Sequence, residues 1–199
     1  MKVVCIVEGH GDAAAAPILI GRIGAAFNIG AFPSRCIRTG GWAHLQRAGE
    51  LERYLELALS HQPDRILILS DLEDDCPVVE AGNFRERIAA VLGDRKVPVE
   101  VVFAMREFES WYLHSAEILS NKNTTFSWDL AKFTGDPETV RGAKEALSKI
   151  MSSRYKEATH QPRFAAAIDV KQLFKKSRSF RRMIKATTGL CYDELAQMV

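Results

Sequence analysis

Four short apolar runs, each followed by a segment of helical character, constrain the fold of this chain most. The runs cover residues 3–7, 34–38, 65–70 and 97–104. The first and third are apolar at nearly every position, as in strands that are buried on both faces of a parallel sheet. Strands that alternate with helices along the chain are typical of a parallel sheet with right-handed crossovers. We therefore predict an α/β fold of three layers, with about four parallel strands between helices.

The segments between these runs have the apolar spacing of helices. We expect helices over residues 13–27, with Asp12 as the N-cap, over 44–61 and over 80–92. Beyond residue 114 the pattern changes, and a loop is expected over 152–163. Further helical stretches are expected at 137–151, 165–174 and 180–186. The chain thus divides into an α/β core, residues 1–114, and a C-terminal α-helical basic extension, residues 115–199, packed on that core.

Composition limits the class of protein. With 199 residues, 47% of them apolar, the chain has enough material for one well-buried core. No apolar stretch reaches the length of a membrane span and no secretory signal is present, so we expect a cytoplasmic protein. The 4 cysteines include no Cys-x-x-Cys pair, which argues against a zinc ribbon and against a disulfide framework.

Charge is distributed unevenly along the chain. Residues 141–185 hold 13 Lys and Arg against 3 Asp and Glu, a charge of +10 in a chain whose net charge is +2. Such asymmetry indicates a polyanionic partner, and a solvated basic face of amphipathic helices is the alternative. Contacts to a nucleic-acid backbone would be independent of sequence and sensitive to salt. The candidates for these contacts are Lys175, Lys176, Arg178, Arg181, Arg182 and Lys185.

Acidic residues follow three of the four predicted strands. They are Glu8 and Asp12 after the first, Asp71, Glu73 and Asp75 after the third, and Glu107 and Glu109 after the fourth. Because the carboxyl ends of parallel strands meet at one edge of the sheet, where open α/β folds bind ligands, we expect these acids to converge. Two carboxylates about 4 Å apart repel by roughly 4 kcal/mol at an effective dielectric constant near 20, and a divalent cation would relieve that repulsion.

The ligand types narrow the choice of cation. Oxygen ligands without a matched set of His or Cys favour Mg²⁺ or Mn²⁺ over Zn²⁺. Such ions activate water and stabilise charge on a leaving oxygen, which is what hydrolysis of a phosphodiester requires. The alternative for the acids after the third strand is a solvated acidic turn.

Two acidic motifs carry a family resemblance. Glu8-Gly9-x-x-Asp12 and Asp71-x-Glu73-x-Asp75 resemble the motifs of the Toprim superfamily of topoisomerases, primases and nucleases. The chain is similar to small stand-alone Toprim-like proteins akin to the nuclease domains of OLD-family (overcoming lysogenization defect) proteins. The similarity extends to Phe108-Glu109-Ser110-Trp111 and to the Gln161-Pro162 and Ser179-Phe180 stretches.

The resemblance implies roles for individual residues. Glu8 would be the general acid/base or bridge metal ions, and Asp71 and Glu73 would bind metal. Asp75 would be a further ligand, and Glu109 would complete or support the site. In the family the two strands that carry these motifs are neighbours. One departure is that Glu73 stands where the family has a second Asp.

The sequence therefore predicts metal-dependent phosphodiester hydrolysis on nucleic acid by a Toprim-type nuclease, with Glu8, Asp71 and Glu73 as catalytic residues. The alternative is a partner-activated or non-catalytic effector subunit that docks on an ATPase. A topoisomerase is disfavoured by the short chain, and a primase by the missing zinc cysteines. His10 and Gly40-Gly41 are weaker candidates for phosphate contacts. An exposed turn explains His10, and no Lys-Ser or Lys-Thr follows the glycines as it would in a Walker loop.

Overall fold

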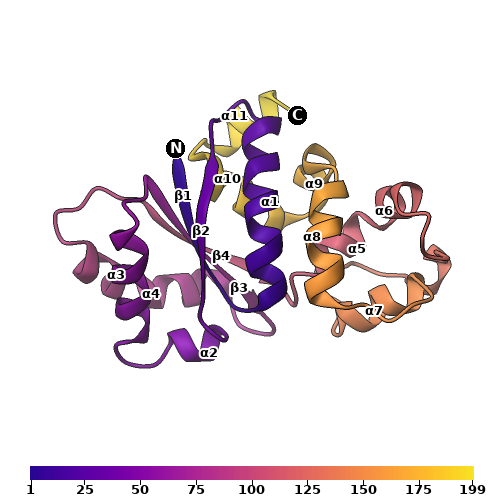
Figure 1. The fold of residues 1–199 in the computed structure, drawn as a ribbon, viewed down its shortest axis with the longest axis horizontal. Coiled ribbons are helices and arrows are strands. Elements are labelled where there is room, and N and C mark those ends of the chain that lie inside the picture. Colours follow the sequence, from indigo (N-terminus) through magenta and orange to yellow (C-terminus); the bar gives the residue numbers. More distant parts are fainter.

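The computed structural model describes residues 1–199 and contains a four-stranded sheet (Figure 1). Its strands are β1 (Lys2–Val7), β2 (Phe32–Arg38), β3 (Arg65–Leu72) and β4 (Val99–Met105). Their spatial order is β2-β1-β3-β4, and every neighbouring pair is parallel. The predicted α/β fold with a parallel sheet is confirmed. The adjacency of β1 and β3 also agrees with the expected arrangement of the strands that carry the acidic motifs.

Helices account for most of the remaining chain. Their bounds are α1 His10–Ala26, α2 Trp42–Leu45, α3 Glu50–Ser60, α4 Pro77–Leu92, α5 Ser110–His114, α6 Ala116–Lys122, α7 Ala143–Ile150, α8 Glu157–Ala167, α9 Val170–Lys176, α10 Arg178–Thr188 and α11 Tyr192–Gln197, with a 3₁₀ turn η1 at Leu130–Lys132. None of the helices combines the length and the apolar character that crossing a membrane requires.

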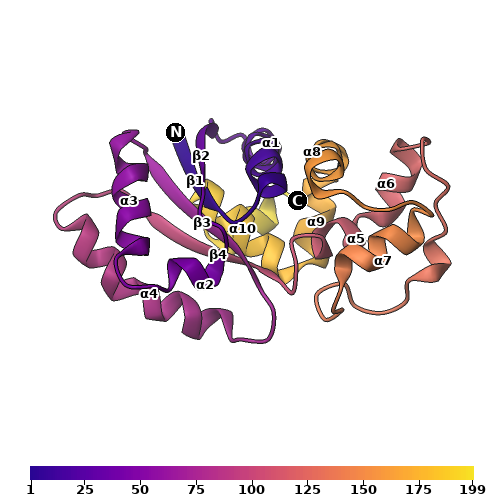
Figure 2. The same cartoon turned by 60° about the horizontal axis from the view of Figure 1, so that its bottom comes forward.

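Helices cover both faces of the sheet (Figures 1 and 2). Helices α3 and α4 pack on one face, whereas α1 packs along β2 and α10 along β4 on the other. The apolar strands pack against the helices on both sides of the sheet, because successive side chains of a strand point to opposite faces. In β1, for example, Val3, Cys5 and Val7 face the α1 side, and Val4 and Ile6 face the α3 side.

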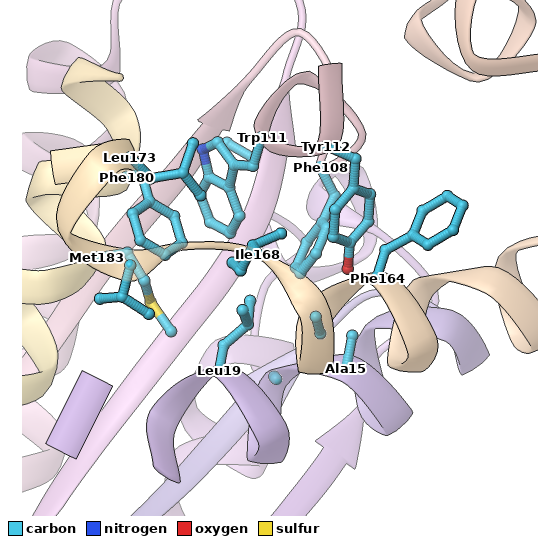
Figure 3. Packing of buried hydrophobic residues seen from close by; sticks show 14 of the residues in the cluster. Ala15, Leu19, Phe108, Trp111, Tyr112, Phe164, Ile168, Leu173, Phe180 and Met183 are labelled. Atoms are coloured by element: carbon cyan, nitrogen blue, oxygen red, sulfur yellow. The ribbon is translucent and has the colours of Figure 1, made fainter. Parts of the chain in front are cut away.

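The larger hydrophobic cluster joins the sheet to the C-terminal helices. It contains 36 buried residues, which range along the chain from Val3 to Leu195, against 15 on the α3 and α4 face. Figure 3 shows Trp111 beside Phe180, with Phe108 and Tyr112 next to them. The Trp111 and Phe180 rings meet edge to face with centroids 5.1 Å apart. Residues beyond position 114 therefore complete the covering of the sheet.

Several helix bounds differ from the expected ones. Helix α1 begins at His10, so Asp12 is not its N-cap; Gly9 takes that place in an extended conformation, and the Asp12 carboxylate reaches back to the Gly9 N–H at 2.9 Å. The helix expected over 44–61 is divided by Gly49, whose φ of +80° interrupts the helical backbone.

The C-terminal half contains a further difference. Helix α8 lies over most of the stretch expected to be a loop, and Pro162 is inside it. The helix expected over 165–174 is interrupted where Ile168 adopts an extended backbone, and Asp169 then caps α9 by accepting the Gln172 N–H at 2.9 Å. A proline normally argues against a helix interior, and here the packing of α8 on α1 outweighs that preference.

Candidate functional site

Glu8 and Asp71 are adjacent at the carboxyl edge of the sheet. Glu8 follows β1, and Asp71 lies near the end of the neighbouring strand β3. The Oε1 atom of Glu8 accepts the Asp71 backbone N–H at 3.0 Å and also the hydroxyl of Ser70. Burial raises the pKa of Glu8, and these hydrogen bonds lower it without outweighing burial. Neutral donors, not an arginine, therefore hold this carboxylate.

Asp71 is the acid whose pKa the charges of the neighbouring acids raise. Its Oδ1 atom accepts the backbone N–H of Phe108 at 2.8 Å, which ties the end of β3 to the turn after β4. Burial raises the pKa of Asp71 well above its usual range, and the charges of Glu109, Asp12 and Glu8 raise it further. Four acids from three segments of the chain therefore share one electrostatic environment.

Asp12 and Glu109 share a single donor. The side-chain amide of Gln161, on α8, donates to Asp12 Oδ1 at 3.2 Å and to Glu109 Oε1 at 3.0 Å. Gln161 is 2% exposed. Burial also raises the pKa of Asp12. Helix α8 thus completes the site that the sheet begins.

Glu109 is the most buried of the four acids. Its side chain is 0% exposed, and its Oε2 atom makes no hydrogen bond of normal length, although the hydroxyl of the buried Tyr155 lies near enough to lower the pKa of Glu109. Burial raises the pKa of Glu109 to about 7. A buried carboxylate oxygen without a partner is costly, so this atom needs a closer donor, such as the Tyr155 hydroxyl, or else a proton or a cation.

Lys144, at the start of α7, supplies a positive charge to this region. Its ammonium group pairs with Glu157 at 2.8 Å and its charge lowers the pKa values of Glu109 and Asp71. Burial opposes the charge of Lys144, but the nearby carboxylates outweigh burial and raise its pKa. One ammonium group does not neutralise all of these acids.

The remaining predicted acids lie elsewhere. Glu73 and Asp75 are exposed in the turn after β3 and make no hydrogen bond or ion pair. Between them, Asp74 pairs with Arg141 at 2.8 Å and with Arg106. The structure therefore gathers Glu8, Asp12, Asp71 and Glu109, and leaves Glu73 and Asp75 in solvent.

The cluster is not a finished metal site. No group of three or more His, Cys, Asp or Glu side chains is arranged to hold a metal ion as it stands. Protein donors occupy oxygens of all four carboxylates, as described above. The donor set nevertheless fits Mg²⁺ or Mn²⁺, because it consists of oxygens and Glu109 Oε2 makes no hydrogen bond of normal length.

The predicted basic residues do not gather at this site. Lys175, Lys176 and Arg178 are exposed around the junction of α9 and α10. Arg182 pairs with Glu100 near the start of β4, and Lys185 lies over the Tyr192 ring with 4.8 Å between Nζ and the centroid. The set, which includes Arg181, therefore extends along α10 toward the opposite edge of the sheet.

Sequence reasoning gave no role to two residues of this site, Gln161 and Lys144. Gln161 belongs to a stretch that shares the family resemblance, but nothing local indicates that its amide bridges two acids. Lys144 carries no distinguishing signal among the many basic residues of the C-terminal half.

Comparison with known proteins places the chain in a family. A family model described as Domain of unknown function (DUF4276) matches residues 7–186. The chain belongs to this family. The DUF4276 match runs from the last residue of β1 into α10, so it spans Glu8, Gln161 and every residue of the cluster between them. No curated protein and no solved structure matches the chain.

Proposed function

We propose that this DUF4276 protein is a metal-dependent phosphodiesterase acting on nucleic acid, a nuclease of the Toprim type. The observation that carries the proposal is the gathering of Glu8, Asp12, Asp71 and Glu109 in one buried environment, where the other three charges raise the pKa of Asp71. Carboxylates that repel one another in this way favour a divalent cation between them.

Asp71 and Glu109 are the proposed principal ligands of Mg²⁺ or Mn²⁺. Glu109 offers its unpartnered Oε2 atom, and Asp71 uses only Oδ1 in its hydrogen bond to Phe108. We place Asp12 in support of them, and Glu73 and Asp75 as further ligands from the exposed turn. A bound divalent cation would supply an activated water and stabilise charge on the leaving oxygen.

Glu8 is the proposed general acid/base. Ser70 and the Asp71 N–H fix its carboxylate, and burial raises its pKa. A carboxylate whose pKa is closer to neutral accepts and returns a proton more readily at physiological pH. The Toprim resemblance supports the same role, since β1 and β3 carry its two motifs side by side.

The test is a cleavage assay with neutral variants of the acids. Purified protein is incubated with plasmid, single-stranded DNA or RNA, with Mg²⁺, Mn²⁺ or EDTA. Glu8→Gln and Asp71→Asn keep the shape of each side chain and remove its charge. Glu86→Gln, an exposed acid on α4 without an ion pair, is the matched control. We expect metal-dependent cleavage in the wild type and the control. Glu8→Gln should lose at least 100-fold, the lower end of what a positioned proton-transfer group contributes, and Asp71→Asn should lose a comparable factor because it removes a proposed metal ligand.

A second candidate function is a partner-activated or non-catalytic subunit that docks on an ATPase. Two apolar side chains favour it: Val78 and Val79, in the first turn of α4, are 76% and 56% exposed directly after the acidic turn. Adjacent exposed apolar side chains occur at protein interaction sites. Absence of cleavage under all conditions would favour this candidate, whereas cleavage that survives both substitutions would refute the assignment of Glu8 and Asp71.

A further inference from the structure

The carboxyl edge of the sheet carries a symmetric order of charges. Arg38 is the last residue of β2, Glu8 follows β1, Asp71 lies at the end of β3, and Arg106 follows β4. Given the strand order, the charges along the edge run positive, negative, negative, positive. Arg38 pairs in register with Val7, and Arg106 donates its backbone N–H to Leu72 at 2.9 Å. The two arginines are therefore three strand spacings, about 14 Å, apart along the edge.

Arg38 lies in an open groove beside Glu8. The groove has a volume of about 520 Å³ and is lined by Glu8, Gly9, His10, Arg38, Thr39 and Gly40. The Arg38 guanidinium donates to the Nε2 atom of His10 and forms no ion pair with any carboxylate. An exposed guanidinium with free donors suits the oxygens of a phosphate group.

The loop after β2 keeps this groove open. Gly40 and Gly41 have φ values of +86° and +119°, which glycine adopts without strain. A Cβ atom at Gly40 would meet nothing within 4 Å, so the space beside it is free. Residues that sequence reasoning held as weak candidates for phosphate contacts, His10 and the two glycines, therefore lie next to one another and next to Arg38.

Arg106 occupies a second pocket on the far side of the acids. Glu73, Arg106, Glu107, Arg141 and Gly142 line this pocket. Arg106 has a φ of +67°, which is strained for a residue with a side chain, and its buried Nε atom has no partner. Arg106 and Arg141 both pair with Asp74, and the two acids that line the pocket, Glu73 and Glu107, pair with neither arginine.

We propose that Arg38 with His10, and Arg106 with Arg141, bind phosphates of a nucleic-acid strand on either side of the carboxylates. The strand then lies across the carboxyl edge from β2 to β4, with one phosphodiester over Glu8 and Asp71. This inference rests on the proposed function, and it moves the main backbone contacts from α9 and α10 to the edge of the sheet.

The experiment measures binding apart from cleavage. A labelled single-stranded oligonucleotide, as DNA and as RNA, is titrated by fluorescence anisotropy in EDTA over a series of KCl concentrations. The variants are Arg38→Gln, with Arg38→Lys to restore the charge, and Arg106→Asn, because Asn tolerates a positive φ. Arg85→Gln, at an exposed arginine of α4 without an ion pair, is the control, and Lys175→Gln/Lys176→Gln tests the contacts expected from the sequence. Urea unfolding of each variant verifies that it is folded.

We expect Arg38→Gln and Arg106→Asn each to weaken binding severalfold and to reduce the slope of log K against log [KCl] by about 0.7, the value for one lost phosphate contact on a single strand. Arg38→Lys should recover the slope, and the Arg85→Gln control should match the wild type. Unchanged slopes in both arginine variants, a loss confined to the lysine variant, or no binding by the wild type would each overturn the inference.

The binding assay and the cleavage assay test the two proposals separately. If the arginine variants lose binding as expected but no condition gives cleavage, hydrolysis is refuted and the two phosphate subsites stand. If the wild type cleaves nucleic acid and the arginine variants bind and cleave as the wild type does, the subsites are refuted and the nuclease assignment stands.

Discussion

The Glu8 carboxylate accepts the backbone N–H of Asp71 at 3.0 Å, so the side chain that follows β1 is fixed to the end of β3. The contact exists because β1 and β3 are hydrogen-bonded neighbours in the sheet. It also makes Glu8→Gln a clean substitution, since an amide oxygen at the same place accepts the same hydrogen bonds without the charge.

Asp71→Asn should raise the free energy of unfolding when divalent ions are absent, by about 0.5–2 kcal/mol, the usual range for a single stabilising substitution. Burial and three neighbouring acids disfavour the charged form of Asp71, and Asn retains an acceptor for the Phe108 N–H. The measurement is urea unfolding at pH 8 in EDTA.

The same variant should lose the stabilisation that Mg²⁺ gives the wild type, which at 100 times the dissociation constant is about 2.7 kcal/mol. Glu86→Gln, at an exposed acid of α4, serves as the control for both measurements. A less stable apo Asp71→Asn protein would mean that the charged carboxylate is a structural acceptor.

Glu109 should make stability depend on pH. Its pKa in the folded protein is about 7, against 4.5 for an ordinary Glu, because the side chain is buried. Between these values the native state holds a proton that the unfolded chain has released, so stability falls as pH rises from about 4.5 to 7 and is level above. The loss attributable to this group is about 3 kcal/mol.

Glu109→Gln should remove that dependence. The difference in unfolding free energy between the variant and the wild type should grow from pH 4.5 to 7 and then stay constant. Urea midpoints at half-unit pH intervals measure it. Parallel curves for the two proteins would show that Glu109 does not titrate in this window.

Gly11→Ala should destabilise the protein by about 1–3 kcal/mol, as overpacking of a filled site does. A Cβ atom at Gly11 would lie 1.9 Å from Gln161 Oε1 and would displace the amide that bridges Asp12 and Glu109. Gly21→Ala is the control in the same helix: nothing lies within 4 Å of its Cβ position, so it should stabilise by about 0.5–1 kcal/mol.

A double-mutant cycle separates this clash from other effects. In a Gln161→Ala background the cost of Gly11→Ala should largely disappear, because the atoms it meets are gone. An equal cost in both backgrounds would place the strain elsewhere, for example at Glu157, whose Cβ is 3.0 Å from the added atom.

Ser179→Ala should cost about 1–3 kcal/mol, the penalty for a buried donor left without a partner. Ser179 Oγ accepts the indole N–H of Trp111 at 2.7 Å inside the cluster that joins the sheet to α10. Ser153→Ala, at an exposed turn, should change stability little.

The same experiment tests whether the two halves of the chain unfold together. Because one hydrophobic cluster includes residues from both, tryptophan fluorescence and far-UV circular dichroism should give coincident urea transitions. Two separate transitions, with only one shifted by Ser179→Ala, would show that residues 1–114 unfold independently of the extension.

The sequence by itself determined the sheet and the edge at which its acids emerge. A run of apolar residues of strand length is typical of a strand buried on both faces of a parallel sheet, so the third run predicts a strand at 65–70, and the structure has β3 at Arg65–Leu72. Parallel strands then bring Glu8, Asp71 and Glu109 to one edge whatever the details of packing.

Only the tertiary structure decided which side chains meet there. Asp71 turns into the buried cluster while Glu73, two residues later, is exposed, because β3 ends at Leu72 between them. Gln161 reaches Asp12 across 149 positions of sequence because α8 packs on α1. Local patterns fix strands and helices through their own periodicity, but contacts between distant segments depend on strand order and helix packing, which no single stretch of residues encodes.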